Sequence, residues 1–220
     1  MLQVLAAVTG GYLVGSFPTA YVVTRWRYGR DIRALGDRNV GAGNVWQAVH
    51  PLVGLFVAAV DIAKGIVAVG LARFFEVPTG VMGAMMLAAV AGHAWPVFLR
   101  FRGGGGVATG GGALLAAMPM LTITAIAGLM GIIAVTRRPK AAVALGFGSI
   151  PFLALWQGET RSLLITSIAM PFLIGLRVFQ QGLAHGLSRR ESLRLILGLH
   201  PAEITGEDFI GADAASLPGR

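Results

Sequence analysis

Apolar segments of near-bilayer length recur along the 220-residue chain and constrain its fold more than any other feature. They cover residues 2–24, 51–74, 79–99, 107–118, 119–136, 141–157 and 161–181. A hydrocarbon core takes roughly 20 apolar residues to cross as a helix, and only helices and closed barrels satisfy their backbone groups there. Just 13% of the residues are charged, and the mean hydropathy is +0.72. The pattern predicts an all-α integral membrane protein, a compact bundle of about seven membrane-embedded helices.

The first apolar segment, the short segment 107–118 and the C-terminal residues each predict a further detail of this fold. No positive charge precedes the segment 2–24, so we interpret it as a first membrane helix and not as a cleaved signal. The segment 107–118 would be about 18 Å long as a helix, which predicts a partial insertion that turns at Pro119. We expect one membrane domain over residues 1–181. Residues 182–220 are predicted to form a basic amphipathic segment followed by a loose cytoplasmic tail.

Most of the 18 Lys and Arg lie in four places, which predicts the topology. These places are the loop 25–50, the stretch 100–102, the stretch 137–140 and the C-terminal end from Arg177 onward. Positive charge collects on the cytoplasmic side of membrane proteins. The N-terminus is therefore expected outside and the C-terminus in the cytoplasm, with the functional loops on the cytoplasmic face.

The loop 100–106 combines arginines with four consecutive glycines. Glycine has no Cβ, so its backbone can approach a ligand closely, and converging N–H groups at a helix N-terminus hold anions. Arg102 would add a forked donor that suits phosphate. The alternative is that the glycines only let helices pack closely and that the arginines snorkel to the surface.

Asp61 and Lys64 place two opposite charges at i,i+3 inside the segment 51–74. Ionisable residues within membrane segments are candidates for function, but a structural ion pair is equally compatible with this spacing. The chain has no cysteine, which excludes disulfides and thiolate chemistry. We expect no metal, no cofactor and no nucleic-acid partner.

Four stretches together resemble one known family. They read GSFPTAYVVTR at 15–25, GRDIRALGDRNVGAGNV at 29–45, DIAKG at 61–65 and GHAWPVFLRFRGGGGVAT at 92–109. In this order they are similar to the bacterial acyl-phosphate-dependent glycerol-3-phosphate acyltransferases of the PlsY type. The resemblance implies a compact helical body in the bacterial inner membrane with its active site at the cytoplasmic face. It also implies transfer of an acyl group from acyl phosphate to glycerol 3-phosphate, giving lysophosphatidic acid for phospholipid synthesis.

The resemblance assigns roles to the residues that match these motifs. The partners it implies are membrane lipid, acyl phosphate and glycerol 3-phosphate; the oligomeric state is left open. The residues implied in binding substrate or phosphate are Arg33, Arg38, Asn39, Asn44, His93, Arg102, Gly103, Gly104, Gly105, Gly106 and Thr109.

The chain departs from the family pattern at the positions implied in catalysis. Asp37 replaces a serine, Gly43 a threonine, Gln47 an arginine and Gly105 a lysine. The C-terminal His and Asn, three residues apart in the family, align with Ser188 and Glu191 or, in another register, with Arg189 and Ser192. His185 lies nearby but has no Asn at that spacing.

Two hypotheses therefore remain open. The first is an acyltransferase of this family. The second is a catalytically impaired homologue that binds a phosphate or phospholipid head group or assists an active paralogue. The replaced positions predict little turnover, because catalytic groups that act together lose most of the rate on the first deletion. A small transporter is a weaker third reading, based only on the intramembrane pair.

Overall fold

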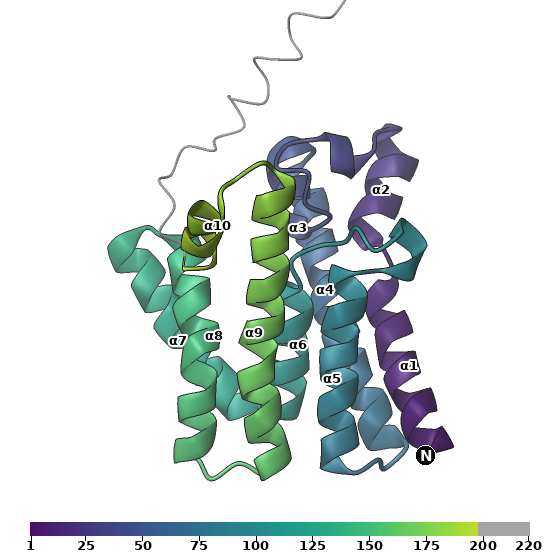
Figure 1. Cartoon of the computed structure of the whole chain (residues 1–220), viewed down its shortest axis with the longest axis vertical. Coiled ribbons are helices and arrows are strands. Elements are labelled where there is room, and N and C mark those ends of the chain that lie inside the picture. Colours follow the sequence, from purple (N-terminus) through teal and green to yellow (C-terminus); the bar gives the residue numbers. More distant parts are fainter. Residues whose placement is uncertain (198–220) are drawn as a thin grey trace, which may run out of the picture.

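A computed structural model describes residues 1–197 and is all-helical, as predicted, with no strand in that range (Figure 1). The elements are α1 (Leu2–Ser16), α2 (Thr19–Tyr28), η1 (Ile32–Ala34), α3 (Ala42–Ala48), α4 (Pro51–Phe74), α5 (Thr79–Ala94), η2 (Val97–Leu99), α6 (Val107–Ala117), α7 (Pro119–Thr136), α8 (Pro139–Trp156), α9 (Arg161–Ala184) and α10 (Arg189–Ile196).

Within residues 1–197, five helices are long and apolar enough to cross a membrane: α4, α5 with the following 3-10 turn, α7, α8 and α9. α6 has only 11 residues, in line with its predicted partial insertion. α7 begins at Pro119, where the missing N–H is tolerated because the first helical donors have no partner within the helix.

The expected single helix over residues 2–24 is wrong, because the chain breaks at Phe17–Pro18 into α1 and α2. Proline lacks an N–H and cannot continue the hydrogen-bond ladder. The carbonyl of Phe17, at the break, accepts a hydrogen bond from Lys64 Nζ at 2.6 Å and the N–H of Thr19 at 3.0 Å. The break therefore turns the chain toward α4, instead of extending it straight across a membrane.

The loop 25–50, which shows no apolar periodicity, contains the short helices η1 and α3. α3 packs against the first turns of α4, where a Cβ on Gly54 would overlap the backbone of Trp46. The side chain of His50 caps α4 by accepting the N–H of Leu52. The loop is thus a folded structure fixed to the bundle.

Helices α4 and α6 pack at backbone distance, because small residues line their contact. A Cβ on Gly65 would overlap the carbonyl of Thr109, and one on Gly112 the carbonyl of Ile62. The main apolar core lies beyond this contact, between α4, α5, α6, α7, α8 and α9, and includes Met86, Leu114 and Met170. This core fixes α6 and hence the glycine-rich loop in front of it.

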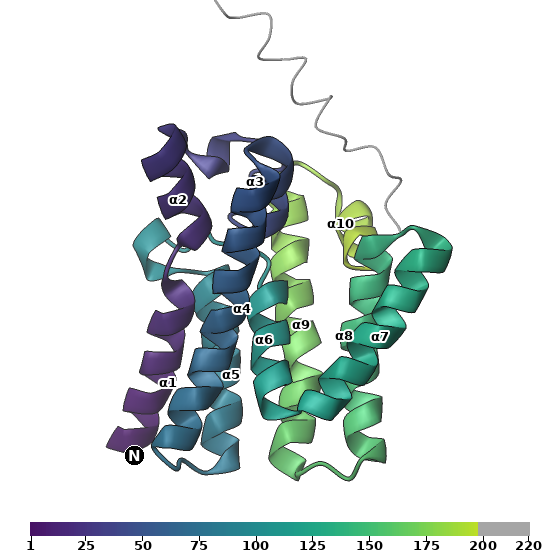
Figure 2. The same ribbon diagram turned by 180° about the vertical axis from the view of Figure 1, so that it is seen from behind.

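The loop 29–50, the turn between α7 and α8 and the C-terminal end of α9 lie at one end of the bundle (Figures 1 and 2). The turns α4–α5 and α8–α9 lie at the other end, together with the N-terminus. α10, in the segment predicted to be basic and amphipathic, packs on α9, with Ser192 buried. The predicted loose tail falls almost wholly on residues 198–220, outside the described part of the chain.

Candidate functional site

The glycine-rich loop follows α5 through a tight turn, and two of its four glycine N–H groups form hydrogen bonds to the end of α5. Arg100 and Phe101 adopt positive φ angles of 53° and 63°. The N–H of Gly103 then donates to the carbonyl of Ala94 at 3.2 Å, and that of Gly104 to the carbonyl of His93 at 3.1 Å. Four glycine N–H groups converging on one anion were expected. Two of them instead hold the loop against the end of α5.

The second half of the loop is arranged differently. A Cβ on Gly105 would meet nothing within 4 Å, whereas one on Gly104 would collide with the ring of His93. Gly106 has φ +87° and is the N-cap of α6. The first N–H groups of α6 have no partners within the helix and give its start a partial positive charge. An anion site is therefore confined to the stretch from Gly105 to the start of α6.

Polar residues on one face of α9 hold this loop and the loop 29–50 together. Arg177 donates from Nη2 to the carbonyl of Gly103 at 2.8 Å and from Nε to that of Gly104 at 3.2 Å. Its guanidinium also lies over the ring of Trp95, 5.8 Å from the centroid. One turn later, Gln181 Nε2 donates to Asn39 Oδ1 at 2.8 Å. Sequence reasoning missed both α9 side chains, although a polar residue every fourth position in an apolar helix was a usable signal.

Within the loop 29–50, Asn44 is an internal brace. Its Nδ2 donates to the carbonyls of Ile32, Leu35 and Asn39 at 2.9–3.3 Å, and its side chain is buried. Asn44 does not line the cavity described below. Asn44 therefore shapes the loop from within, and the substrate contact that the resemblance implied stays a prediction.

The charges of the same loop have specific partners. Arg33 forms a two-pronged ion pair with Asp31, and its hydrogen bonds hold the pKa of Asp31 below the usual value. The ion-pair partner of Arg33 is therefore Asp31, and not Asp37 in the same loop. Asp37 Oδ1 accepts the N–H of Asn39 at 3.0 Å, which stabilises the turn.

A cavity of about 1030 Å³ opens between the two loops, α8, α9 and α10. Of the residues singled out from the sequence, it is lined by Arg33, Asp37, Arg38, Asn39, Gln47, Arg102, Gly103 and Gly105. Its other charged or titratable lining residues are Lys140, Arg177 and His185. Asp37 is the one carboxylate among these described lining residues, so cations dominate the polar end. Apart from Gln180 and Gln181, the rest of the wall is apolar and comes largely from α8 and α9, including Val143, Phe147 and Ile174.

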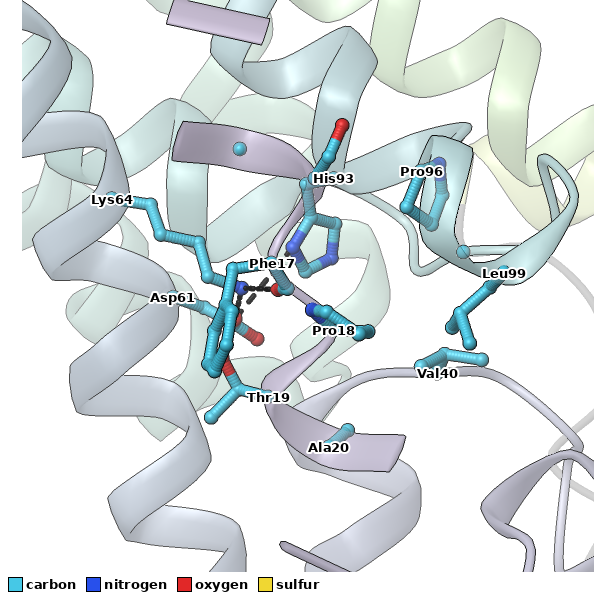
Figure 3. A pocket seen from close by; sticks show the side chains of 13 residues that line it. Phe17, Pro18, Thr19, Ala20, Val40, Asp61, Lys64, His93, Pro96 and Leu99 are labelled. Carbon is cyan, nitrogen blue, oxygen red and sulfur yellow. Dashed lines mark hydrogen bonds and ion pairs between the residues drawn. The ribbon is translucent and has the colours of Figure 1, made fainter. Parts of the chain in front are cut away.

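His93 and Thr109 lie outside this cavity, in the packed interior. Figure 3 shows His93 beside the ion pair of Asp61 and Lys64, whose Oδ1 and Nζ atoms are 2.6 Å apart. His93 Nδ1 is 3.6 Å from the same carboxylate oxygen. The space among these side chains is only about 10 Å³, about the size of a single water site and far too small for a substrate. Thr109 is fully buried in α6.

Three further positions that align with family catalytic residues lie outside the cavity. Gly43 is exposed on α3 and does not line the cavity, and a Cβ there would meet nothing within 4 Å. Ser188 and Glu191 form the capping box of α10, in which each side chain accepts the backbone N–H of the other residue. These two side chains serve the start of α10, and neither lines the cavity.

The chain is similar in sequence to known glycerol-3-phosphate acyltransferases. The family model for glycerol-3-phosphate acyltransferase matches residues 5–183. The glycerol-3-phosphate acyltransferase of Desulforudis audaxviator is 43% identical over 150 residues, which are 68% of this chain and 75% of the relative. That of Desulforamulus reducens is 37% identical over 161 residues, 73% of this chain and 80% of the relative.

Solved structures show the same arrangement. The crystal structure of PlsY (YgiH), an integral membrane glycerol 3-phosphate acyltransferase, in its glycerol 3-phosphate form superposes with a TM-score of 0.75 at 30% identity. The match covers 84% of this chain and 93% of that chain. The lysophosphatidic acid form of PlsY matches with a TM-score of 0.73 at 28% identity, over 89% of this chain and 98% of that chain.

Proposed function

Since the chain belongs to the glycerol-3-phosphate acyltransferase family, we propose that it transfers an acyl group from acyl phosphate to glycerol 3-phosphate, giving lysophosphatidic acid and phosphate. The observation that carries this proposal is the cavity between the loops and α9. It joins a cation-rich end to an apolar wall within one space of about 1030 Å³.

The two parts of the cavity suit the two parts of the reactants. Phosphate groups call for forked, charged donors, and Arg33, Arg38 and Arg102 line the polar end. An acyl chain calls for apolar surface, and Phe147 and Ile174 line the same cavity. The crystal structures of PlsY include a glycerol 3-phosphate form and a lysophosphatidic acid form, which supports a site for both ligands in this fold.

The reaction needs the developing oxyanion to be stabilised and the leaving phosphate to be held. The start of α6 directs backbone N–H groups out of the stretch that begins at Gly105, and a helix N-terminus favours negative charge. Arg177 holds the two residues just before that stretch through the carbonyls of Gly103 and Gly104. The donors are thus set before substrate binds, and little reorganisation is left for the reaction step.

The setting of the site is part of the proposal. We place the cavity at the cytoplasmic face of a bacterial inner membrane, with the N-terminus outside and the C-terminus inside. The charge map supports this, because the basic clusters at 25–38, 137–140 and 177–194 lie at the end of the bundle where the cavity opens. Water-soluble glycerol 3-phosphate and membrane-dissolved acyl chains then reach one site from two sides.

The test is a direct assay. The full chain, purified in detergent, is given palmitoyl phosphate and radiolabelled glycerol 3-phosphate, and labelled lysophosphatidic acid is separated by thin-layer chromatography. We expect labelled product above that of a protein-free control, but at a rate below the roughly 1 s⁻¹ of an ordinary enzyme, because several family catalytic positions are replaced. Binding of glycerol 3-phosphate by calorimetry, with no product above that of a protein-free control, would contradict the transfer and leave only the binding.

That contrary result defines the second candidate function, binding of a phosphate head group without transfer. Gln47 and Gly105 line the cavity without charge, where the family pattern has arginine and lysine. Ser188 and Glu191 are engaged in the cap of α10. The remaining cations of the cavity can hold a phosphate without them, so binding and turnover must be measured on the same preparation.

A further inference from the structure

α10 has one face that no other part of residues 1–197 covers. The family model ends at residue 183, before this helix begins, so the family pattern assigns it no role. One side of α10 packs on α9, with Ser192 fully buried there, and Leu195 and Ile196 line the cavity. The other side is exposed.

The exposed face has a regular order of residues. On a helix with about 3.6 residues per turn, Leu193 and Leu197 are neighbours along one stripe. Arg189 borders this stripe on one side, and Arg190 and Arg194 border it on the other. All five side chains are exposed, the two leucines to 54% and 57%. The face is therefore an apolar stripe with arginines along both of its edges.

This pattern fits the surface of a bilayer that contains anionic lipids. Leucines on such a helix enter the boundary between head groups and acyl chains, and arginines beside them keep their charge in the head-group layer. Each guanidinium can hold a lipid phosphate by forked hydrogen bonds. Glu191, the one carboxylate of α10, lies off this face and is engaged in the capping box, so no acid opposes the phosphates.

The connection to α9 keeps α10 near the membrane surface. α9 has 24 residues and is therefore about 36 Å long, slightly more than the roughly 30 Å hydrocarbon core of a bilayer. Only residues 185–188 join it to α10, a connection that reaches at most about 18 Å. α10 also contacts α8. The exposed cations of the turn before α8 lie at the same end of the bundle (Figures 1 and 2): Arg137, Arg138 and Lys140.

We propose that the exposed face of α10 binds the head groups of anionic phospholipids and holds this helix along the membrane surface. Because Leu195 and Ile196 on the other side line the cavity, the same contact supports one wall of the site. The partner is a lipid surface and not free phosphate, since a small ion would leave the leucine stripe in water. The binding does not depend on acyl transfer.

The experiment uses lipids that carry a nitroxide quencher. The chain has no cysteine, so Leu193→Cys takes a single bimane fluorophore on the stripe. The full chain is reconstituted in phosphatidylcholine vesicles with equal small fractions of either nitroxide-bearing phosphatidylglycerol or nitroxide-bearing phosphatidylcholine. We expect quenching by the anionic lipid to exceed quenching by the neutral lipid at least about threefold, because arginines near the membrane surface attract anionic lipid.

Two variants and a second label position serve as controls. Exchange of all three α10 arginines for glutamine should bring the quenching ratio to about one, whereas exchange for lysine keeps the charge and should retain most of the preference. The fluorophore at Gln157→Cys, in the exposed turn at the opposite end of the bundle, should show no preference. If the glutamine variant does not reconstitute, the ratio measured with the native arginines still decides the matter.

Equal quenching by the two lipids at Leu193→Cys would overturn the proposal, whether that quenching is strong or absent. Strong and equal quenching would mean that only the leucines touch the bilayer, and its absence would mean that the face meets water or another protein. Product formation from palmitoyl phosphate in the same vesicles tests the function proposed above separately. Product without an anionic preference would reject only the lipid surface, and the preference without product would reject only the transfer.

Discussion

Gly104 and Gly105 are adjacent and chemically identical, yet their surroundings give them different roles. The position that a Cβ would take on Gly104 is filled by the ring of His93 and the carbonyl of Val40. The same position on Gly105 is open, and Gly105 lines the cavity. The first glycine is needed for packing. The second leaves space that a larger side chain could occupy without strain.

We predict that Gly105→Lys binds glycerol 3-phosphate about tenfold more tightly than wild type, since a new cation near a partly solvated phosphate is worth about 1.4 kcal/mol. Calorimetry on the detergent-solubilised protein measures the change. The matched variant is Gly104→Ala, which adds one methyl group in the packed position and should lower the melting temperature instead. Equal effects of the two variants on stability would show that Gly105 is also a packing residue.

The contacts of single residues were predictable from the sequence where the two partners are close together in one helix. Asp61 and Lys64 are three residues apart in one helix, so their ion pair follows from that spacing. The bracing role of Asn44 does not, because it depends on how the loop 29–50 folds back on itself. The hydrogen bond between Gln181 and Asn39 does not follow from the sequence either, because the two residues are 142 positions apart and meet only in the folded chain.

At the scale of elements, α9 connects the two loops of the site. Arg177 reaches two consecutive carbonyls of the glycine-rich loop, a geometry that suits the fork of a guanidinium and not the single ammonium of lysine. Trp95 stacks on the same guanidinium and donates its indole N–H to Gln180 at 3.0 Å. The position of the loop therefore depends on the identity of this one α9 side chain.

Arg177→Lys is expected to lower kcat/KM for glycerol 3-phosphate about tenfold or more, because the variant keeps the charge and loses one charged hydrogen bond worth roughly 1.5–3 kcal/mol. Steady-state kinetics at fixed acyl phosphate measures it. Arg161→Lys, the same substitution at the exposed start of α9, serves as control and should change nothing. Wild-type kinetics in Arg177→Lys would mean that the loop keeps its position without the fork.

The ends of a helix were predictable from the sequence where a proline and a change from apolar to polar residues mark the same boundary. α4 runs over Pro51–Phe74, as the apolar pattern predicts, because a proline opens it and charged or turn residues follow it. The apolar run over residues 2–24 hid the break at Phe17–Pro18, since hydropathy does not register a missing N–H. Helices inside the loop 25–50 were missed because their apolar residues contact other parts of the same loop and the bundle, without a regular period.

At the scale of the whole molecule, the charged residues fall into two groups: cations around the cavity at one end of the bundle, and an ion pair in its interior. The cations of the cavity and the basic clusters lie at one end of the bundle, with α10 beside them (Figure 2). The pair of Asp61 and Lys64 lies deeper, where it supports the break between α1 and α2 through the carbonyl of Phe17. The fold class was predictable because bilayer physics limits the choices. The cavity was not, because it forms between loops and helices far apart in sequence.

The final prediction concerns orientation, and the absence of cysteine from the chain makes it simple to test. Single cysteines at Arg30 and at Phe101, both exposed, should react with a membrane-impermeant maleimide only after spheroplasts are opened. A cysteine at Gln157, in the exposed turn between α8 and α9, should react in intact spheroplasts, because that turn lies at the opposite end of the bundle (Figure 1). The positive-inside rule sets this direction. Labelling of Arg30→Cys and Phe101→Cys from opposite sides would contradict the joint site itself. Labelling of both from outside would only reverse the orientation and place the cavity away from the cytoplasmic pool of glycerol 3-phosphate.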